Sequence, residues 1–125
     1  MKKTISTPAA PAAIGPYSQA VQIGDMLYTS GQIPFNPQTM EIETQDVAEQ
    51  TKQVMENLKA VLAAANMTFE NVIKCTIFIK DMNDFAKINE VYGAYFPENP
   101  PARSCVEVAR LPRDVKVEIE CIASN

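Results

Sequence analysis

The sequence predicts an α+β domain in which two helices cover one face of a β-sheet. Two observations carry this prediction. Two segments of the 125-residue chain repeat their apolar residues at helical spacing, whereas the other apolar segments are short and rich in β-branched residues. Both predicted helices lie between predicted strands, and two helices leave the second face of the sheet without a helical cover.

The N-terminal part is predicted to form a loop followed by a hairpin. Three of the nine prolines lie within the first sixteen residues, where they disfavour regular structure, and a short edge strand at Lys3–Ser6 precedes them. The apolar segments Ala20–Ile23 and Met26–Gln32 are separated by Gly24-Asp25, which is typical of a hairpin turn. The prolines of Pro34–Pro37 end the second strand.

The strongest helix signal runs from Asp46 to Ala65. Asp46 followed by Glu49 resembles a capping arrangement, and Asn66 is a residue type that ends helices in the left-handed conformation. The apolar face of this helix consists of Val47, Val54, Leu58, Val61, Leu62 and Ala65.

The second half of the chain is predicted to alternate between strand and helix. Val72–Lys80 is a β-branched strand, and Asp84 is expected to cap a helix that Pro97 ends. The apolar face of that helix consists of Phe85, Ile88, Tyr92 and Tyr95. The last two strands are predicted at Arg103–Ala109 and Val115–Ala123, so the order after the edge strand is β-β-α-β-α-β-β.

Alternation within the strands predicts which side chains meet the helices. The faces expected under the helices carry Ile73, Cys75, Ile77 and Ile79 in one strand and Val117, Ile119, Cys121 and Ala123 in another. The opposite faces mix apolar and charged residues, such as Phe78, Glu118 and Ile122. This uncovered side, with Arg103 and Glu118 both expected on it, is either solvated or covered by another subunit. Its mixed residues favour a partly polar subunit interface with a small pocket.

The composition indicates one globular domain over residues 1–125, because 46% apolar and 21% charged residues are ordinary for such domains. A net charge of −4 does not favour a nucleic-acid partner. No apolar stretch reaches membrane-spanning length, and the N-terminus does not match a signal peptide. Three cysteines without close spacing fit free thiols in a reducing cytoplasm.

The chain contains no histidine, which excludes several kinds of site. Serine–histidine and cysteine–histidine pairs cannot form within it, and neither can a histidine-based metal centre; we expect no metal site. The four glycines form no phosphate-binding loop motif. Any catalysis therefore depends on carboxylates, arginine, lysine, tyrosine, serine, cysteine or backbone amides.

Two residues are the main candidates for chemistry. Arg103, at the start of one strand, is suited to bind a carboxylate through two parallel hydrogen bonds, unless it is a surface or ion-paired arginine. Glu118 lies between β-branched residues, where a carboxylate is suited to move protons, although a solvent-facing glutamate gives the same pattern.

Further candidates have structural alternatives that stay open. Tyr17 either lines a pocket or covers the core. Cys105 either belongs to the site, on the same face as Arg103, or is a small buried apolar residue of the core. Ser30-Gly31 either lets a ligand approach backbone amides or forms a β-bulge. Asn89 either points to the sheet edge or is a surface residue.

Four segments in order resemble the signatures of the RidA family, also called YjgF, over effectively the whole chain. They are Ala13-Ile14-Gly15-Pro16-Tyr17-Ser18-Gln19-Ala20, Tyr28-Thr29-Ser30-Gly31-Gln32-Ile33-Pro34, Pro101-Ala102-Arg103-Ser104-Cys105-Val106-Glu107-Val108 and Val117-Glu118-Ile119-Glu120-Cys121-Ile122-Ala123. The resemblance implies a chorismate-mutase-like α+β fold with a mixed sheet, and a homotrimer with clefts between subunits.

The resemblance also implies an activity. The archetypal members hydrolyse 2-imino acids such as 2-iminobutanoate and 2-iminopropanoate, which escape from PLP-dependent dehydratases, to 2-oxo acids and ammonia without a cofactor. Arg103 matches the family's carboxylate-binding arginine, and Glu118 matches the glutamate that activates water. The matching cleft residues are Tyr17, Ser30, Gly31, Asn89 and Cys105.

Two other functions remain open at this stage. One is a trimeric regulatory protein that binds small carboxylates through Arg103 without turning them over. The other is an RNA-directed role, against which the negative charge and the absence of histidine argue.

Overall fold

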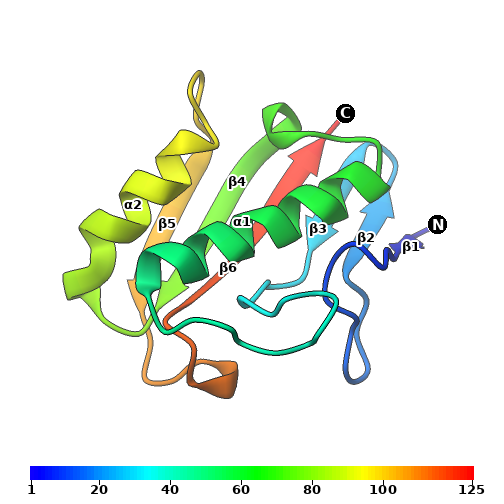
Figure 1. Ribbon diagram of the computed structural model, residues 1–125. Coiled ribbons are helices and arrows are strands. Elements are labelled where there is room, and N and C mark those ends of the chain that lie inside the picture. The colour runs from blue at the N-terminus through cyan, green and yellow to red at the C-terminus, as the bar shows by residue number, and fades with distance from the viewer.

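The computed structural model describes residues 1–125 and contains one six-stranded sheet with both long helices on the same face (Figure 1). The strands follow the spatial order β1-β2-β3-β6-β4-β5. The β4–β5 pair is parallel and is connected through α2, whereas the other neighbouring pairs are antiparallel. The predicted α+β class, mixed sheet and one-sided helical cover are confirmed. Neither helix combines the length and apolarity needed to cross a bilayer.

The elements agree closely with the predicted segments. The strands are β1 (Lys3–Ile5), β2 (Ala20–Ile23), β3 (Met26–Thr29), β4 (Val72–Ile79), β5 (Ala102–Glu107) and β6 (Val117–Ser124). The helices are α1 (Val47–Ala64) and α2 (Phe85–Ala94), with 3₁₀ turns η1 (Phe69–Asn71), η2 (Met82–Asp84) and η3 (Pro112–Asp114) that the sequence did not predict.

The start and end of α1 follow the predicted chemistry. The Asp46 carboxylate accepts a hydrogen bond of 3.0 Å from the Glu49 amide, and Asn66 adopts the left-handed conformation with φ of 59°. The predicted apolar face of α1 is buried against the sheet. Burial of each Val or Leu side chain there contributes about 1.5–3 kcal/mol to the free energy of unfolding. The core between the helices and the sheet includes Leu27, Leu58, Leu62, Ile77, Ile79, Ile88 and Ile119.

Two local predictions are wrong. The Asp84 side chain makes no capping hydrogen bond, because η2 leads directly into α2 and the Asp81 carboxylate accepts from the Asn83 amide instead. Ile73 does not face the helices and is 48% exposed. An irregularity between Val72 and Lys74 shifts the pairing of β4 with β6, so Val72 occupies the buried position.

The predicted strand from Met26 to Gln32 is interrupted at Ser30 and Gly31. β3 ends at Thr29, and the chain rejoins the sheet at Gln32, which exchanges two backbone hydrogen bonds of 2.8 and 3.1 Å with Ile119 of β6. Ser30 and Gly31 therefore lie at an irregular point of the sheet rather than within a continuous strand.

A buried amide on α1 holds the segment that follows this interruption. The Asn57 side chain is 1% exposed, and its Nδ2 donates to the carbonyls of Phe35 at 2.9 Å and Ile33 at 3.2 Å. Its Oδ1 accepts from Gln53 at 2.9 Å. Both functional groups of this amide are therefore satisfied, as burial requires.

We expect Asn57→Ala to lower the free energy of unfolding by roughly 2 kcal/mol, because it leaves buried carbonyl groups without a donor. The matched control is Gln53→Ala, which keeps both bonds to the Ile33–Phe35 segment. Urea unfolding of the two variants measures the difference. Equal losses of stability would show that these bonds contribute little.

Candidate functional site

The register of the sheet separates the two main candidates. Arg103 of β5 pairs with Cys75 of β4, whereas Glu118 of β6 pairs with Phe78. Paired residues share a face, and positions 75 and 78 of one strand point to opposite faces. Cys75 is buried under the helices, so Arg103 projects to the helical side and Glu118 to the uncovered side.

The prediction that Arg103 and Glu118 share the uncovered face is therefore wrong. Residue types and alternation place each side chain relative to its own strand neighbours, but they do not fix the register between two strands. The parallel pairing of β5 with β4 decides the orientation of Arg103, and this pairing depends on the α2 crossover.

Glu118 lines a cavity of about 650 Å³ together with three of the other candidates, Tyr17, Ser30 and Gly31. The remaining wall residues are Ile14, Ile33, Phe35, Pro112, Arg113 and Glu120. This volume lies in the range of small-molecule sites. The structure thus brings together four candidates from three distant parts of the sequence.

Gly31 and Glu118 are in close contact in this cavity. A Cβ atom on Gly31 would overlap the Glu118 carboxylate and lie 2.9 Å from its Cδ. The N–H and C=O groups of Gly31 make no hydrogen bond within the chain. Glycine at this position therefore makes room for the carboxylate and leaves backbone groups beside it for a ligand.

The loop that carries Tyr17 is held by buried polar contacts. The Ser30 hydroxyl donates to the Ser18 carbonyl at 2.6 Å, which ties the loop to the end of β3. The Gln19 side chain is 3% exposed and bonds the backbone of the preceding loop at Thr7, Ala10 and Pro11. Tyr17 itself remains 52% exposed, so its ring is available to a ligand.

Glu118 is half-buried and accepts no hydrogen bond within the chain. Burial raises the pKa of Glu118 above the ordinary range of a glutamate, and the nearby charge of Glu120 raises it further. A carboxylate with a raised pKa is a better proton acceptor near neutral pH than an exposed one. This environment suits general acid–base chemistry.

The other candidates gather around Arg103 at the sheet edge. An Arg103 guanidinium nitrogen donates to Oδ1 of Asn89 at 2.6 Å, and the guanidinium carbon lies 5.4 Å from the Phe85 ring centroid and 5.2 Å from that of Tyr92. The two aromatic rings and the Asn89 side chain of α2 therefore hold the guanidinium in place. No carboxylate pairs with Arg103, so its remaining donors are free to bind an anion.

Cys105 lies on the same face of β5 as Arg103 and is partly buried. Burial raises the pKa of the Cys105 thiol, and the Arg103 charge offsets this only in part. The thiol is therefore protonated at neutral pH and is not an activated nucleophile.

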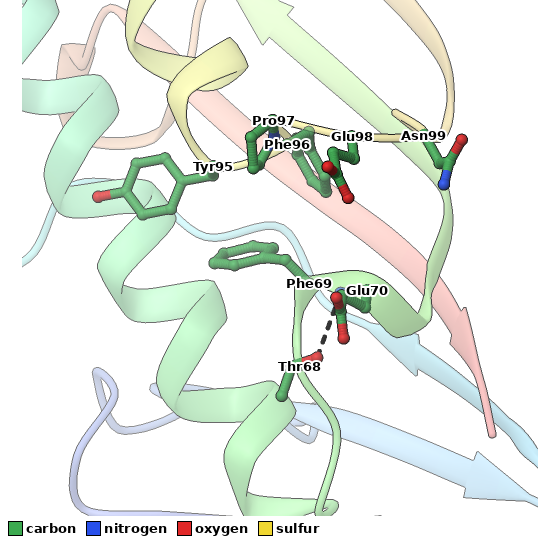
Figure 2. A pocket seen from close by; sticks show the side chains of 8 residues that line it. All are labelled: Thr68, Phe69, Glu70, Tyr95, Phe96, Pro97, Glu98 and Asn99. Atoms are coloured by element: carbon green, nitrogen blue, oxygen red, sulfur yellow. Dashed lines mark hydrogen bonds between the residues drawn. The ribbon is translucent and has the colours of Figure 1, made fainter.

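A second cavity, of about 440 Å³, lies between η1 and the end of α2 and contains none of the candidates (Figure 2). The ring of Phe69 packs edge-on against Tyr95 and Phe96, with centroids 5.3 Å apart in both pairs. The aromatic residues thus form a packed wall of the fold. No group of three or more His, Cys, Asp or Glu side chains is arranged to hold a metal ion.

Sequence reasoning missed several residues that shape the site. Phe85 and Tyr92 were recognised only as an apolar helix face, and Gln19 and Asn57 carry no pattern that predicts burial. Arg113 follows Pro112 between the last two predicted strands, and nothing in its neighbourhood indicated that it lines a cavity with Glu118.

Comparisons with known proteins identify similar chains. The family model described as Endoribonuclease L-PSP matches residues 7–125. The 2-iminobutanoate/2-iminopropanoate deaminase of Escherichia coli K12 is 56% identical over 126 residues, covering 98% of each chain. Two solved structures from E. coli, TdcF with bound serine and the YjgF gene product, superimpose with TM-scores of 0.94 and 0.95, each at 54% identity and covering 98% of both chains.

We expect Glu118→Gln to raise the melting temperature at about pH 8, because the raised pKa means that ionised Glu118 destabilises the folded state. The sign follows from the direction of the shift: the penalty is present above the folded pKa and disappears below the unfolded value of about 4.3. The gain should therefore vanish at about pH 4.

The matched control for this measurement is Glu90→Gln, which removes an exposed carboxylate on α2. It is expected to show no such pH-dependent gain. A melting temperature of Glu118→Gln that is below that of the native chain at pH 8 would contradict the burial argument.

Proposed function

Because the chain belongs to the Endoribonuclease L-PSP family, the RidA family that its motifs resemble, we propose that it is a deaminase that hydrolyses small 2-imino acids to 2-oxo acids and ammonia. The main structural support for this proposal is the chemistry of two candidate residues, Arg103 and Glu118. A free guanidinium and a half-buried carboxylate of raised pKa each lie in a prepared environment, and together they provide an anchor and a proton acceptor.

The opposite orientations of Arg103 and Glu118 support an active site shared between two copies of the chain. Arg103 lies on the edge strand β5, from which it can extend into the cavity of a neighbour. The uncovered sheet face offers a surface for association, since Ile23, Tyr28 and Val106 are 51%, 46% and 43% exposed on it. A head-to-tail contact repeated around a closed ring gives a homotrimer with equivalent sites.

Each site would combine two half-sites. One copy supplies Arg103 together with Asn89 and Cys105, and the neighbour supplies the cavity with Glu118. Arg103 binds the carboxylate of the imine in a bidentate manner, which fixes the imine carbon beside a water molecule at Glu118. Tyr17, Ser30 and the free backbone groups of Gly31 complete the binding surface around the substrate.

The reaction requires only proton transfers. Glu118 accepts a proton as the water oxygen bonds to the imine carbon, which forms a tetrahedral amino alcohol once the nitrogen is protonated. Glu118 then returns its proton to the nitrogen. As the C–N bond breaks, the C=O double bond forms and the hydroxyl proton passes to the departing ammonia or to solvent, so that ammonium and the 2-oxo acid leave. Positioning and general acid–base help each contribute a hundredfold or more. PLP-dependent dehydratases would supply the imine, since such enzymes release it.

The family name favours a second candidate, cleavage of RNA. The net charge of −4 and the absence of histidine argue against an acid–base ribonuclease that binds a polyanion. RNA cleavage by the purified chain that disappears in Arg103→Ala would favour this alternative. A non-catalytic carboxylate-binding protein would bind 2-oxo acids but release none from imines.

We expect Arg103→Lys to lower kcat/KM for imine hydrolysis by roughly a hundredfold or more, because lysine lacks the planar two-donor geometry. We expect Glu118→Gln to lower kcat by a similar factor of about a hundred while the variant still binds 2-oxobutanoate. The assay measures 2-oxo acid released from imine that a dehydratase produces in situ, above the spontaneous rate.

The control for both variants is Lys59→Met, which removes a charge from the exposed side of α1 and should retain full activity. If Arg103→Lys kept activity near that of the native chain, bidentate binding of the substrate carboxylate by Arg103 would be refuted. An unchanged kcat in Glu118→Gln would show that Glu118 is not the proton acceptor.

A further inference from the structure

Arg113 is the only cationic side chain among the residues that line the Glu118 cavity. Its guanidinium lies over the Phe35 ring, 5.3 Å from the centroid, and forms no hydrogen bond or ion pair. Stacking on an aromatic ring leaves the donors at the guanidinium edge free. The proposed mechanism gives this residue no role, although it faces the same cavity as the proton acceptor.

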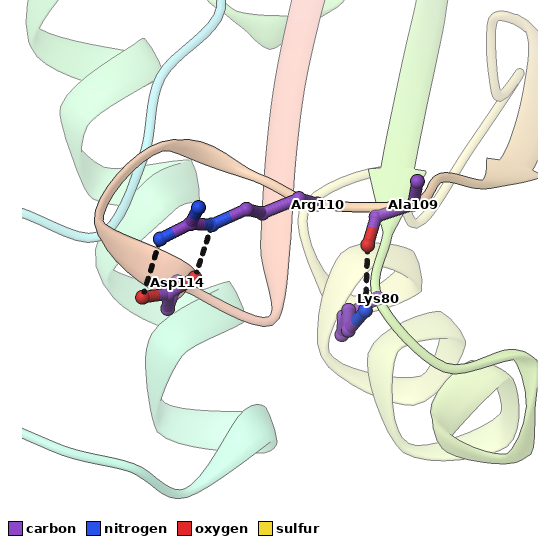
Figure 3. Close-up of polar contacts among 4 residues, drawn as sticks. All are labelled: Lys80, Ala109, Arg110 and Asp114. Carbon is purple, nitrogen blue, oxygen red and sulfur yellow. Dashed lines mark hydrogen bonds and ion pairs between the residues drawn. The ribbon is translucent and has the colours of Figure 1, made fainter.

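The loop around Arg113 is held in an unusual conformation. Arg113 and Asp114 have φ of 59° and 56°, a left-handed region that costs free energy for residues with a Cβ. Across this turn, the Arg110 guanidinium donates two hydrogen bonds of 2.7 and 3.3 Å to the Asp114 carboxylate (Figure 3). Leu111 and Val115 are 5% and 1% exposed on either side.

Lys80 forms hydrogen bonds to both ends of the same loop. Its ammonium group donates to the Ala109 carbonyl at 2.6 Å (Figure 3). Its backbone N–H donates to the Lys116 carbonyl at 3.1 Å. The Gln50 side chain accepts from the Lys116 amide at 2.8 Å. The backbone of the loop is therefore anchored on both sides of Arg113, whose exposed side chain lies at the wall of the cavity.

The cavity wall carries charges of both signs, and only one of them is positive. Glu118 and Glu120 would repel an anionic side chain of the substrate, and Arg113 is the one wall residue that would attract it. A cation without a partner on this wall indicates a subsite for a distal anionic group.

We propose that Arg113 is a specificity-determining residue that binds the distal carboxylate of 2-imino acids whose side chain ends in a carboxylate. The inference rests on the proposed function, in which Arg103 of a neighbouring copy binds the carboxylate next to the imine. The five-carbon 2-imino diacid is then a better substrate than the five-carbon 2-imino acid with an alkyl side chain.

Calorimetric binding of 2-oxopentanedioate and 2-oxopentanoate tests this subsite without turnover. The native chain should bind the diacid more tightly. Arg113→Gln should weaken diacid binding by about tenfold or more and leave monoacid binding within about twofold, because only the charged hydrogen bonds are lost. Arg113→Lys should retain part of the diacid preference. The control is Lys59→Gln, which removes an exposed charge on α1.

The same variants are then assayed with imines that an amino-acid oxidase generates in situ from glutamate and norvaline, with O₂ as the oxidant. Arg113→Gln should lower the kcat/KM ratio of diacid over monoacid by the factor seen in binding. Equal affinity of the native chain for both acids, or an equal loss of both in Arg113→Gln, would overturn the role of Arg113. Arg113-dependent diacid binding with no hydrolysis of any imine would instead refute the proposed function and leave the subsite in place.

Discussion

The molecule depends on one geometric constraint, the register in which β4 pairs with its two neighbours. Arg103 and Glu118 are aligned with positions of β4 that are three residues apart, so they lie on opposite faces of the sheet. No rotamer change brings them together through the sheet. The two half-sites and the role we propose for a second copy both follow from this alignment.

Buried polar contacts, rather than the apolar core alone, give each half-site its shape. The Asn57 amide on α1 fixes the Ile33–Phe35 wall of the cavity, and Gln19 fixes the loop of Tyr17. Because a buried polar group without a partner is costly, these bonds make the surrounding loops adopt one arrangement. The carboxylate of Glu118 receives no such bond, and its pKa is raised as a result of burial.

The sequence predicted the elements of the fold well because periodicity and capping are local properties. The α1 face, its Asp46 cap and the Asn66 stop all depend on residues within a few positions of one another. The gathering of Tyr17, Ser30, Gly31 and Glu118 in one cavity was anticipated only through the family resemblance. Register is a long-range property, so the face of Arg103 was predicted wrongly. The irregular pairing that exposes Ile73 and the position of Arg113 at the cavity also depend on long-range contacts. The sequence therefore carries no recognisable pattern for either.

Complementation between two inactive variants tests the shared site most directly. Arg103→Ala and Glu118→Gln chains are unfolded together, refolded as a mixture and assayed for imine hydrolysis. If each site takes Arg103 from one copy and Glu118 from its neighbour, random mixing restores about a quarter of the native activity, because about one site in four then has both residues. Each variant refolded alone stays inactive. A mixture with no more activity than the separate variants would show that the site is not shared between copies.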